Sequence, residues 1–245
     1  MAGFNNVTEL PHIASPNIDE VLEEFLLEQE EQLSLYTLRR YERIIDYFAS
    51  CMNEYGYLYL TRAELLLFER LNRLSDSLPM EFCQVFGPAK IPENVPEFLG
   101  YYVIRKVRCG KQNSKLAGIV IKKLGRWLFD KGYIPAEDMR EMVRIGGEAA
   151  RLLPEALELT ERLAAYASIH APKSWVNEVE DLFVVTRIED EKVFLSGITS
   201  GGETYCVRLP SDISEKLKAG WQITLLLGQT HRGWRIIEVG EVYPL

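Results

Sequence analysis

The stretch SKLAGIVIKKLGRWLFDK, residues 114–131, carries the clearest helical pattern of the chain. At about 100° per residue, its apolar side chains fall on one side of a helix and three cations fall within about 40° of each other on the opposite side. Ser114 is expected to cap this helix and Gly132 to end it. The apolar members are Leu116, Val120, Leu124, Trp127 and Leu128, and the cations are Lys115, Lys122 and Arg126.

Earlier parts of the chain also favour helices. Capping residues and apolar spacing predict helices at 18–32, 35–53 and 61–74, with Asn17 capping the first and Thr61 the third. A fourth segment, 97–107, fits a helix or a strand, because it contains a run of strand-forming residues. We therefore expect an all-α helical bundle over 18–134, after an irregular lead-in over 1–17.

The second half of the chain changes in character after Pro172. Residues 135–172 are helix-prone and are expected to form a helical connector, broken at Gly146-Gly147. Residues 173–245 contain three expected strands, a short helix and two further strands, which is the element order of a small five-stranded barrel of the oligonucleotide- or oligosaccharide-binding kind. The predicted fold class is α+β. The strands are expected at 182–188, 192–198, 204–209, 221–227 and 234–239, and the helix at 212–217.

Composition excludes several classes of protein. Hydrophobic residues make up 47% and charged residues 26% of the chain, which is typical of a folded protein rather than a disordered one. No apolar run is long enough to span a bilayer, and the N-terminus does not resemble a secretory signal, so we expect a cytoplasmic protein without a membrane partner. The four cysteines form no Cys-x-x-Cys pair, and the three histidines are scattered, so neither a metal site nor another cofactor is expected.

The distribution of charge indicates a polyanionic partner. The formal net charge is −8, yet residues 61–134 carry 13 basic and 7 acidic side chains. Between Arg105 and Lys131 nine basic residues face a single acid, Asp130. Such a run inside an acidic protein favours a partner such as a nucleic acid over a merely solvated helix face.

Two stretches of the helical half resemble a known family. SLYTLRRY at 34–41, followed by Ile45 and Phe48, and Asn113-Ser114 with its apolar stripe and KGYI at 131–134, are similar to the N-terminal core-binding (SAM-like) domain of tyrosine recombinases, the phage-integrase family. The resemblance covers about residues 18–134. It implies an integrase-like, DNA-binding domain of four to five helices that serves DNA recombination and DNA integration.

In that family, basic side chains of the second and last helices contact double-stranded DNA. The resemblance implies that the equivalent residues here contact phosphates, which set affinity and salt dependence rather than sequence choice. The candidate DNA-binding residues are Arg39, Arg40, Arg43, Arg105, Lys106, Arg108, Lys111, Lys115, Lys122, Lys123 and Arg126.

The catalytic domain of a recombinase is absent from the sequence. The fragment His231-Arg232-Gly233-Trp234-Arg235 and the nearby Tyr243 do not have the expected spacing, and about 110 residues after the resembling part are too few for that domain. No nucleotide-binding, zinc-protease or hydrolase motif occurs either. We therefore expect no enzyme and no catalytic residues, and predict a non-catalytic DNA-binding protein.

An alternative interpretation is a regulatory protein–protein interaction module that keeps the helical fold without binding DNA. The strongly acidic first 60 residues support it, because an acidic surface repels DNA. A homodimer or a protein partner could form through the connector helices or through the barrel.

Overall fold

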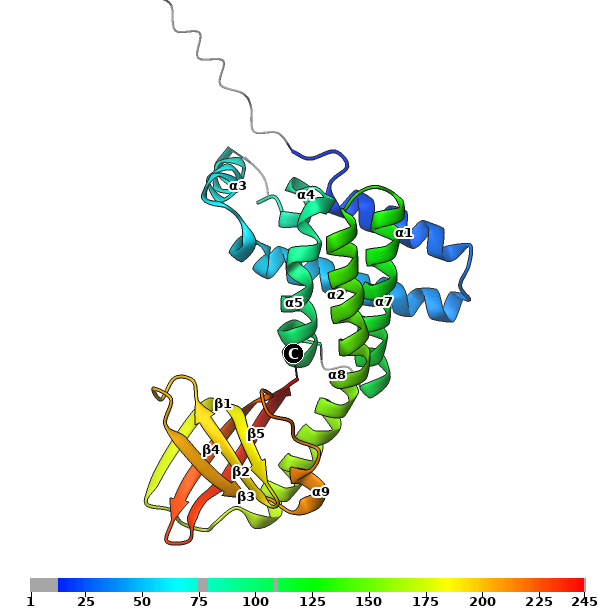
Figure 1. Cartoon of the computed structure of the whole chain (residues 1–245). Helices are drawn as coiled ribbons and strands as arrows, with labels where there is room; N and C mark the ends of the chain where they lie inside the picture. Colours follow the sequence, from blue (N-terminus) through cyan, green and yellow to red (C-terminus); the bar gives the residue numbers. More distant parts are fainter. Residues whose placement is uncertain (1–12, 75–78, 108–109, 245) are drawn as a thin grey trace, which may run out of the picture. The chain divides into compact units, whose positions relative to one another are not determined.

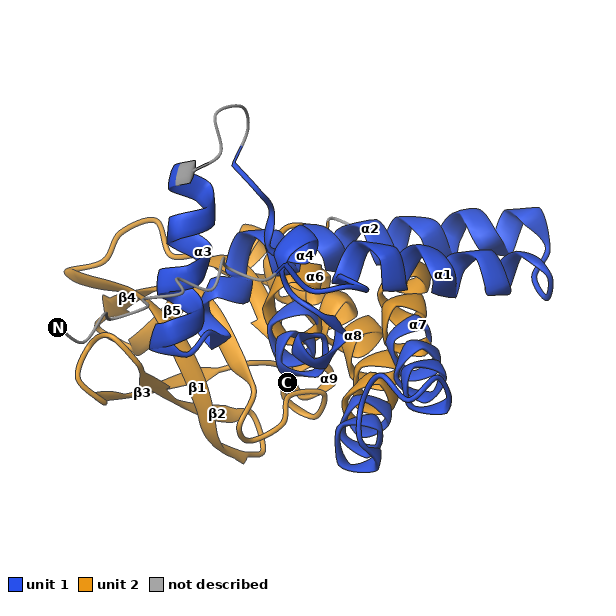
Figure 2. Ribbon diagram, turned by 90° about the horizontal axis from the view of Figure 1, so that it is seen from above, with its two compact units in different colours: residues 1–98, 120–144 blue, residues 99–119, 145–245 orange. Residues whose placement is uncertain are grey.

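The computed structural model describes residues 13–74, 79–107 and 110–244. The chain forms two compact units, and each unit combines stretches that are separate in sequence (Figure 2). Unit 1 comprises the residues up to Phe98 and Val120–Arg144, and unit 2 comprises Leu99–Ile119 and Ile145–Leu245. This division cuts across the domain boundaries expected at 134 and 172, because two long helices each run through both units.

Unit 1 is helical, and its helices begin where local capping signals predict. In the capping box of helix α1 (Ile18–Glu30), the backbone N–H of Glu20 donates to the Asn17 side chain and Glu20 accepts from the Asn17 backbone. Ser34 caps α2 (Leu35–Tyr55), and Thr61 forms a reciprocal pair with Glu64 at the start of α3 (Arg62–Leu74). The short helices α4 (Phe82–Val85) and α5 (Val95–Glu97) follow, with 3-10 turns η1 (Gly56–Tyr59), η2 (Pro88–Lys90) and η3 (Pro92–Asn94) between the elements.

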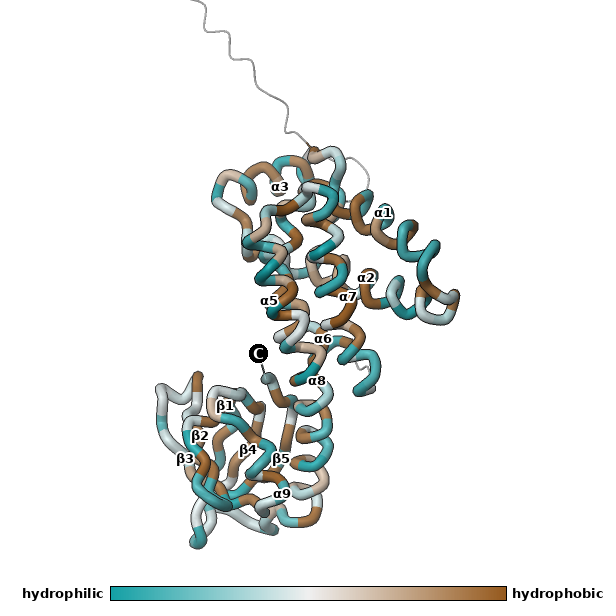
Figure 3. The backbone as a smooth tube through the Cα atoms, turned by 45° about the vertical axis from the view of Figure 1, so that its right-hand side comes forward, coloured by the Kyte–Doolittle hydropathy of each residue, from teal (hydrophilic) through white to brown (hydrophobic). Residues whose placement is uncertain are grey.

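Aromatic side chains pack against one another in the core of unit 1, among a larger number of aliphatic ones. Phe48 of α2 lies 4.9 Å from Phe98, and Phe82 lies 4.6 Å from Phe86, measured between ring centroids. Apolar and polar residues are interspersed along these helices, as Figure 3 shows by colour. Burial of one face of each helix is the main stabilising contribution in such a bundle.

The structure resolves one alternative in the helical half and corrects one expectation. The segment expected as a helix or a strand is helical, as a π-helical stretch η4 (Phe98–Tyr102) followed by α6 (Val103–Arg105). Helix α7 runs from Lys111 to Asp130, so Ser114 is not its cap. The Ser114 hydroxyl is buried and donates to the Lys111 carbonyl at 2.9 Å, which is the backward bond that serine makes inside a helix.

The expected break at Gly146-Gly147 is wrong, because α8 runs without interruption from Ala136 to His170. The close approach of this part of α8 explains instead why α7 has a glycine at position 118. A Cβ atom at Gly118 would lie 2.4 Å from the Gly146 carbonyl oxygen and 2.5 Å from the Ala150 nitrogen, so the two helix backbones approach closely. Packing at this crossing outweighs the cost of about 1 kcal/mol for a glycine inside a helix.

Unit 2 contains a closed ring of five strands (Figure 1). The strands follow the order β1-β2-β3-β5-β4, and β4 pairs again with β1. All neighbours are antiparallel except β3 and β5, which meet at a single parallel pair, Val207 and Trp234. The α+β class and the five strands are thus confirmed. The bounds are β1 (Asn177–Glu189), β2 (Lys192–Gly197), β3 (Thr204–Arg208), α9 (Ser211–Ser214), β4 (Gln222–Thr230) and β5 (Gly233–Tyr243).

The C-terminal part of α8 belongs to the core of this ring. Leu159 and Leu163 are fully buried in the same cluster as Phe183 and Leu227 of the strands. This part of α8 therefore closes the hydrophobic interior of unit 2 rather than only linking two domains.

Candidate nucleic-acid interface

Helices α2 and α7 present most of the expected DNA-binding residues of unit 1. Lys123 of α7 places its Nζ atom over the ring of Tyr41 of α2, 5.6 Å from the ring centroid. This contact packs α7 against the buried side of α2, whereas the helical step places Arg39 and Arg43 on the opposite side of α2. The residues concerned are Arg39, Arg40 and Arg43 of α2 and Lys122, Lys123 and Arg126 of α7.

Most of these cations are available to an external anion. Among the described residues, no carboxylate lies within salt-bridge distance of Arg39, Arg43, Lys122 or Arg126. Arg40 lies over the ring of Tyr36, 5.8 Å from its centroid, and Tyr36 is 72% exposed. A polyanion would therefore meet guanidinium groups alongside an exposed aromatic ring.

Two exposed apolar side chains share the basic sector of α7. Ile119 and Phe129 are 39% and 40% exposed, and the helical step places both within about 60° of Lys122. The sequence analysis did not single them out, although the same periodicity would have found them. Apolar groups between cations can contact sugars or bases where the cations bind phosphates.

Carboxylates of α1 neutralise the C-terminal end of the basic run. Lys131 pairs with Glu24 at 2.9 Å and with Glu28, while Trp127 and Tyr133 also donate hydrogen bonds to these two acids. The hydrogen bonds from Lys131 hold the pKa of Glu24 and of Glu28 below the ordinary glutamate value. Lys131 is thus occupied within the fold.

The remaining candidates lie in unit 2 and are less uniform. Lys111 pairs with Glu158 at 3.5 Å and Glu161 at 3.6 Å, and Arg105 donates to the Tyr101 hydroxyl at 2.8 Å. Hydrogen bonds from Lys216 and Arg162 lower the pKa of Glu158 to about 2, so this acid stays charged at neutral pH. Lys106 is exposed, and Arg108 lies outside the described residues.

Lys115 lines a hollow of about 420 Å³ between α7 and α8 together with Arg151. The floor of the hollow includes Gly147 and Ala150. Arg151 was not among the expected DNA-binding residues, because only the packing of the two helices brings it near Lys115. The ten expected cations that the structure describes fall into two sets, six in unit 1 and four in unit 2.

The tyrosine near the C-terminus is buried against another tyrosine. Tyr243 is only 8% exposed and stacks on Tyr101, with 6.2 Å between ring centroids. Burial raises the pKa of its hydroxyl, which makes the nucleophilic phenolate less accessible. The fragment from His231 to Arg235 lies at the turn between β4 and β5, as the sequence predicts.

Comparison with models of protein families, with curated proteins and with solved structures finds no match to this chain. The resemblance to the core-binding domain of tyrosine recombinases therefore stays a prediction from the sequence.

Three further properties concern metal ligands, membrane-spanning helices and thiols. Within residues 13–74, 79–107 and 110–244, no group of three or more histidine, cysteine or acidic side chains is placed to hold a metal ion. Across the same residues, no helix is long and apolar enough to cross a membrane. Burial raises the pKa of the Cys51 and Cys83 thiols, which disfavours the reactive thiolate form.

Proposed function

We propose that unit 1 binds double-stranded DNA without catalysis, through the cations of α2 and α7. The observation that supports this proposal is that, among the described residues, Arg39, Arg43, Lys122 and Arg126 have no carboxylate within salt-bridge distance. We expect Arg39 and Arg43 on α2, and Lys122 and Arg126 on α7, to offer positive charge to DNA phosphates.

The proposed binding depends mainly on electrostatics. Phosphate contacts release condensed counterions, so affinity falls as salt rises and depends little on base sequence. The overall charge of −8 opposes such binding at long range, which makes the local basic surface decisive.

Charge reversal on α7 tests the proposal. We expect the variant Lys122→Glu, Lys123→Glu, Arg126→Glu to lose most of its affinity for a fluorescein-labelled duplex in anisotropy titrations. The slope of log affinity against log salt should become shallower by about 2.7, because each lost phosphate contact contributes about 0.9.

A matched control uses three exposed arginines of α3 in the same unit. The variant Arg62→Glu, Arg70→Glu, Arg73→Glu changes the net charge by the same amount, and we expect it to keep the wild-type slope. Equal losses in both variants, or unchanged binding in the α7 variant, would contradict the proposed interface. No binding by the wild-type protein would favour the protein-interaction module instead.

Release of Lys131 should strengthen binding. The double variant Glu24→Gln, Glu28→Gln removes both acids that pair with Lys131, so one more cation becomes available to phosphate. We expect tighter binding and a slope steeper by about 0.9 in the same titration. The variant Glu30→Gln, Glu31→Gln has the same change in charge at exposed positions of the α1 end, and a similar gain there would show that only net charge matters.

A further inference from the structure

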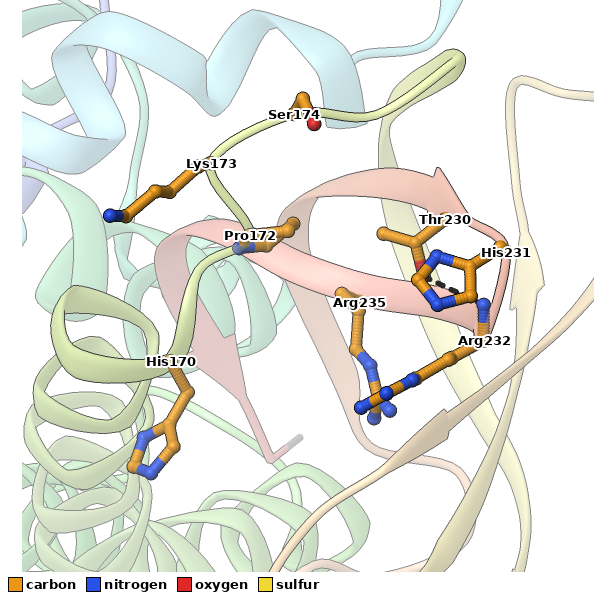
Figure 4. Close-up of a pocket in the computed structure, with 8 residues that line it drawn as sticks. All are labelled: His170, Pro172, Lys173, Ser174, Thr230, His231, Arg232 and Arg235. Atoms are coloured by element: carbon orange, nitrogen blue, oxygen red, sulfur yellow. Dashed lines mark hydrogen bonds between the residues drawn. The ribbon is translucent and has the colours of Figure 1, made fainter.

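A hollow of about 310 Å³ lies beside the turn between β4 and β5 of unit 2. Its lining residues come from this hairpin and from the segment that links α8 to β1 (Figure 4). Three of them carry a permanent positive charge, Lys173, Arg232 and Arg235, and none is acidic. Both histidines of the described chain, His170 and His231, line it as well.

Two of the lining cations, Arg232 and Arg235, come from the β4–β5 hairpin and lie on one side of this hollow. Figure 4 shows the side chains of Arg232 and Arg235 extending toward each other, whereas His170 and Lys173 extend away from them on the other side. Among the described residues, neither arginine has a carboxylate within salt-bridge distance. Two converging guanidinium groups without an acid repel each other, and an anion bound between them would remove that repulsion.

The hairpin holds Arg232 in a defined position. The Thr230 hydroxyl donates to the Gly233 carbonyl at 2.8 Å and accepts from the Arg232 backbone N–H at 3.2 Å. Gly233 has a φ of 96°, which a residue with a side chain rarely adopts. The turn is therefore shaped before any ligand arrives, and less ordering is needed on binding.

We propose that this hollow binds the phosphate group of a small molecule, with Arg232 and Arg235 as its two guanidinium ligands. Arginine forks match phosphate oxygens in pairs of hydrogen bonds, and two of them favour a dianion over a chloride-like ion. The site lies in unit 2 and is separate from the DNA interface proposed for unit 1.

A small ligand fits this unit better than a polyanionic chain does. Residues 173–245 carry eight basic and eleven acidic side chains, so a long anion running across the strands would meet net negative charge. The positive charge gathers at the hollow, whose volume accommodates one or two phosphate groups with part of a small molecule.

Isothermal titration of the full chain with pyrophosphate, and separately with inorganic phosphate, tests the site. We expect saturable binding that weakens at least tenfold in the double variant Arg232→Gln, Arg235→Gln. Amide shifts in ¹H–¹⁵N spectra on adding pyrophosphate should centre on residues 230–235. The control variant Arg187→Gln, Arg208→Gln removes two exposed arginines from the same ring of strands and should bind pyrophosphate as the wild type does.

Each remaining outcome counts against the proposal. Absence of saturable binding below about 10 mM pyrophosphate, equal losses in both variants, or shifts centred elsewhere would overturn it. Binding of single-stranded oligonucleotide but not of pyrophosphate would also overturn it, because the site would then recognise a chain. Duplex-DNA binding should be unchanged in the Arg232→Gln, Arg235→Gln variant, so failure here and failure of the proposed function are distinguishable.

Discussion

Replacement of Asp181 by alanine should destabilise unit 2 by about 3 kcal/mol or more. The carboxylate is 5% exposed and accepts hydrogen bonds from the Thr199 backbone at 3.0 Å, the Thr199 hydroxyl at 2.8 Å and the Ser200 backbone at 2.8 Å. It thereby anchors the loop between β2 and β3. Without it, partly buried donors lose their acceptor, and the cost of leaving them unpaired adds to the lost bonds.

Gly197 shows how closely this loop packs on the carboxylate. A Cβ atom there would lie 2.5 Å from the Asp181 Oδ2 atom, so no larger residue fits at that point of β2. The measurement is urea unfolding followed by tryptophan fluorescence. The control is Glu180→Ala, an exposed neighbour on the same strand, which should change stability by about 0.5 kcal/mol or less. If Asp181→Ala unfolded at the same urea concentration as this control, the anchoring role would be wrong.

The contribution of Asp181 should also depend on pH. Burial alone would raise the pKa of this carboxyl, but hydrogen bonds from Thr199 and Ser200 hold it well below the ordinary aspartate value. A group with a lowered folded pKa stabilises the fold above its unfolded pKa of about 3.9 and loses that effect as the pH falls toward the folded value. The difference in stability between wild type and Asp181→Asn should therefore narrow below about pH 4, by at most about 1.4 kcal/mol per pH unit.

A single methyl group at Gly118 should also destabilise the protein, by about 1–3 kcal/mol. At an exposed position in a helix, replacing glycine by alanine stabilises the fold by about 1 kcal/mol. The change in stability expected for Gly118→Ala therefore has the opposite sign to the change that helix propensity alone predicts. The reason is that a Cβ there meets the backbone of α8 at Gly146 and Ala150, which cannot move aside as a flexible side chain can.

Gly147 provides the matched control for Gly118→Ala. It is exposed on α8, and a Cβ there would meet nothing within 4 Å. We expect Gly147→Ala to raise the free energy of unfolding by about 0.5–1 kcal/mol in the same urea titrations. A gain in stability for both variants would show that α7 and α8 do not pack closely at Gly118.

Helix starts that depend on near neighbours in the chain could be predicted from the sequence, whereas features that depend on distant contacts could not. Asn17, Ser34 and Thr61 satisfy backbone groups within three residues, so their pattern was sufficient to place three helix starts. Ser114 is a serine like Ser34, yet its hydroxyl donates to the carbonyl of Lys111, three residues earlier, inside a helix that begins before it. Nothing local distinguishes these two uses of serine.

The candidate site shows the same contrast. The sequence sufficed to name the cations of α2 and α7, because charge and helical period are read directly from residue order. It could not show that Lys131 meets Glu24, 107 residues away, or that Lys111 meets Glu158, 47 residues away. Those pairings arise only when packing brings distant helices together.

The sequence by itself determined the α+β class, most helix starts, the five strands and the concentration of positive charge between residues 105 and 131, since each depends on neighbours within a few positions. Only the tertiary structure decided that α8 continues through Gly146-Gly147, which cations are neutralised, and that Arg232 and Arg235 share one hollow. The physical reason is that close backbone approach, ion pairing and cavity shape depend on contacts between residues far apart in the chain, which local periodicity does not encode.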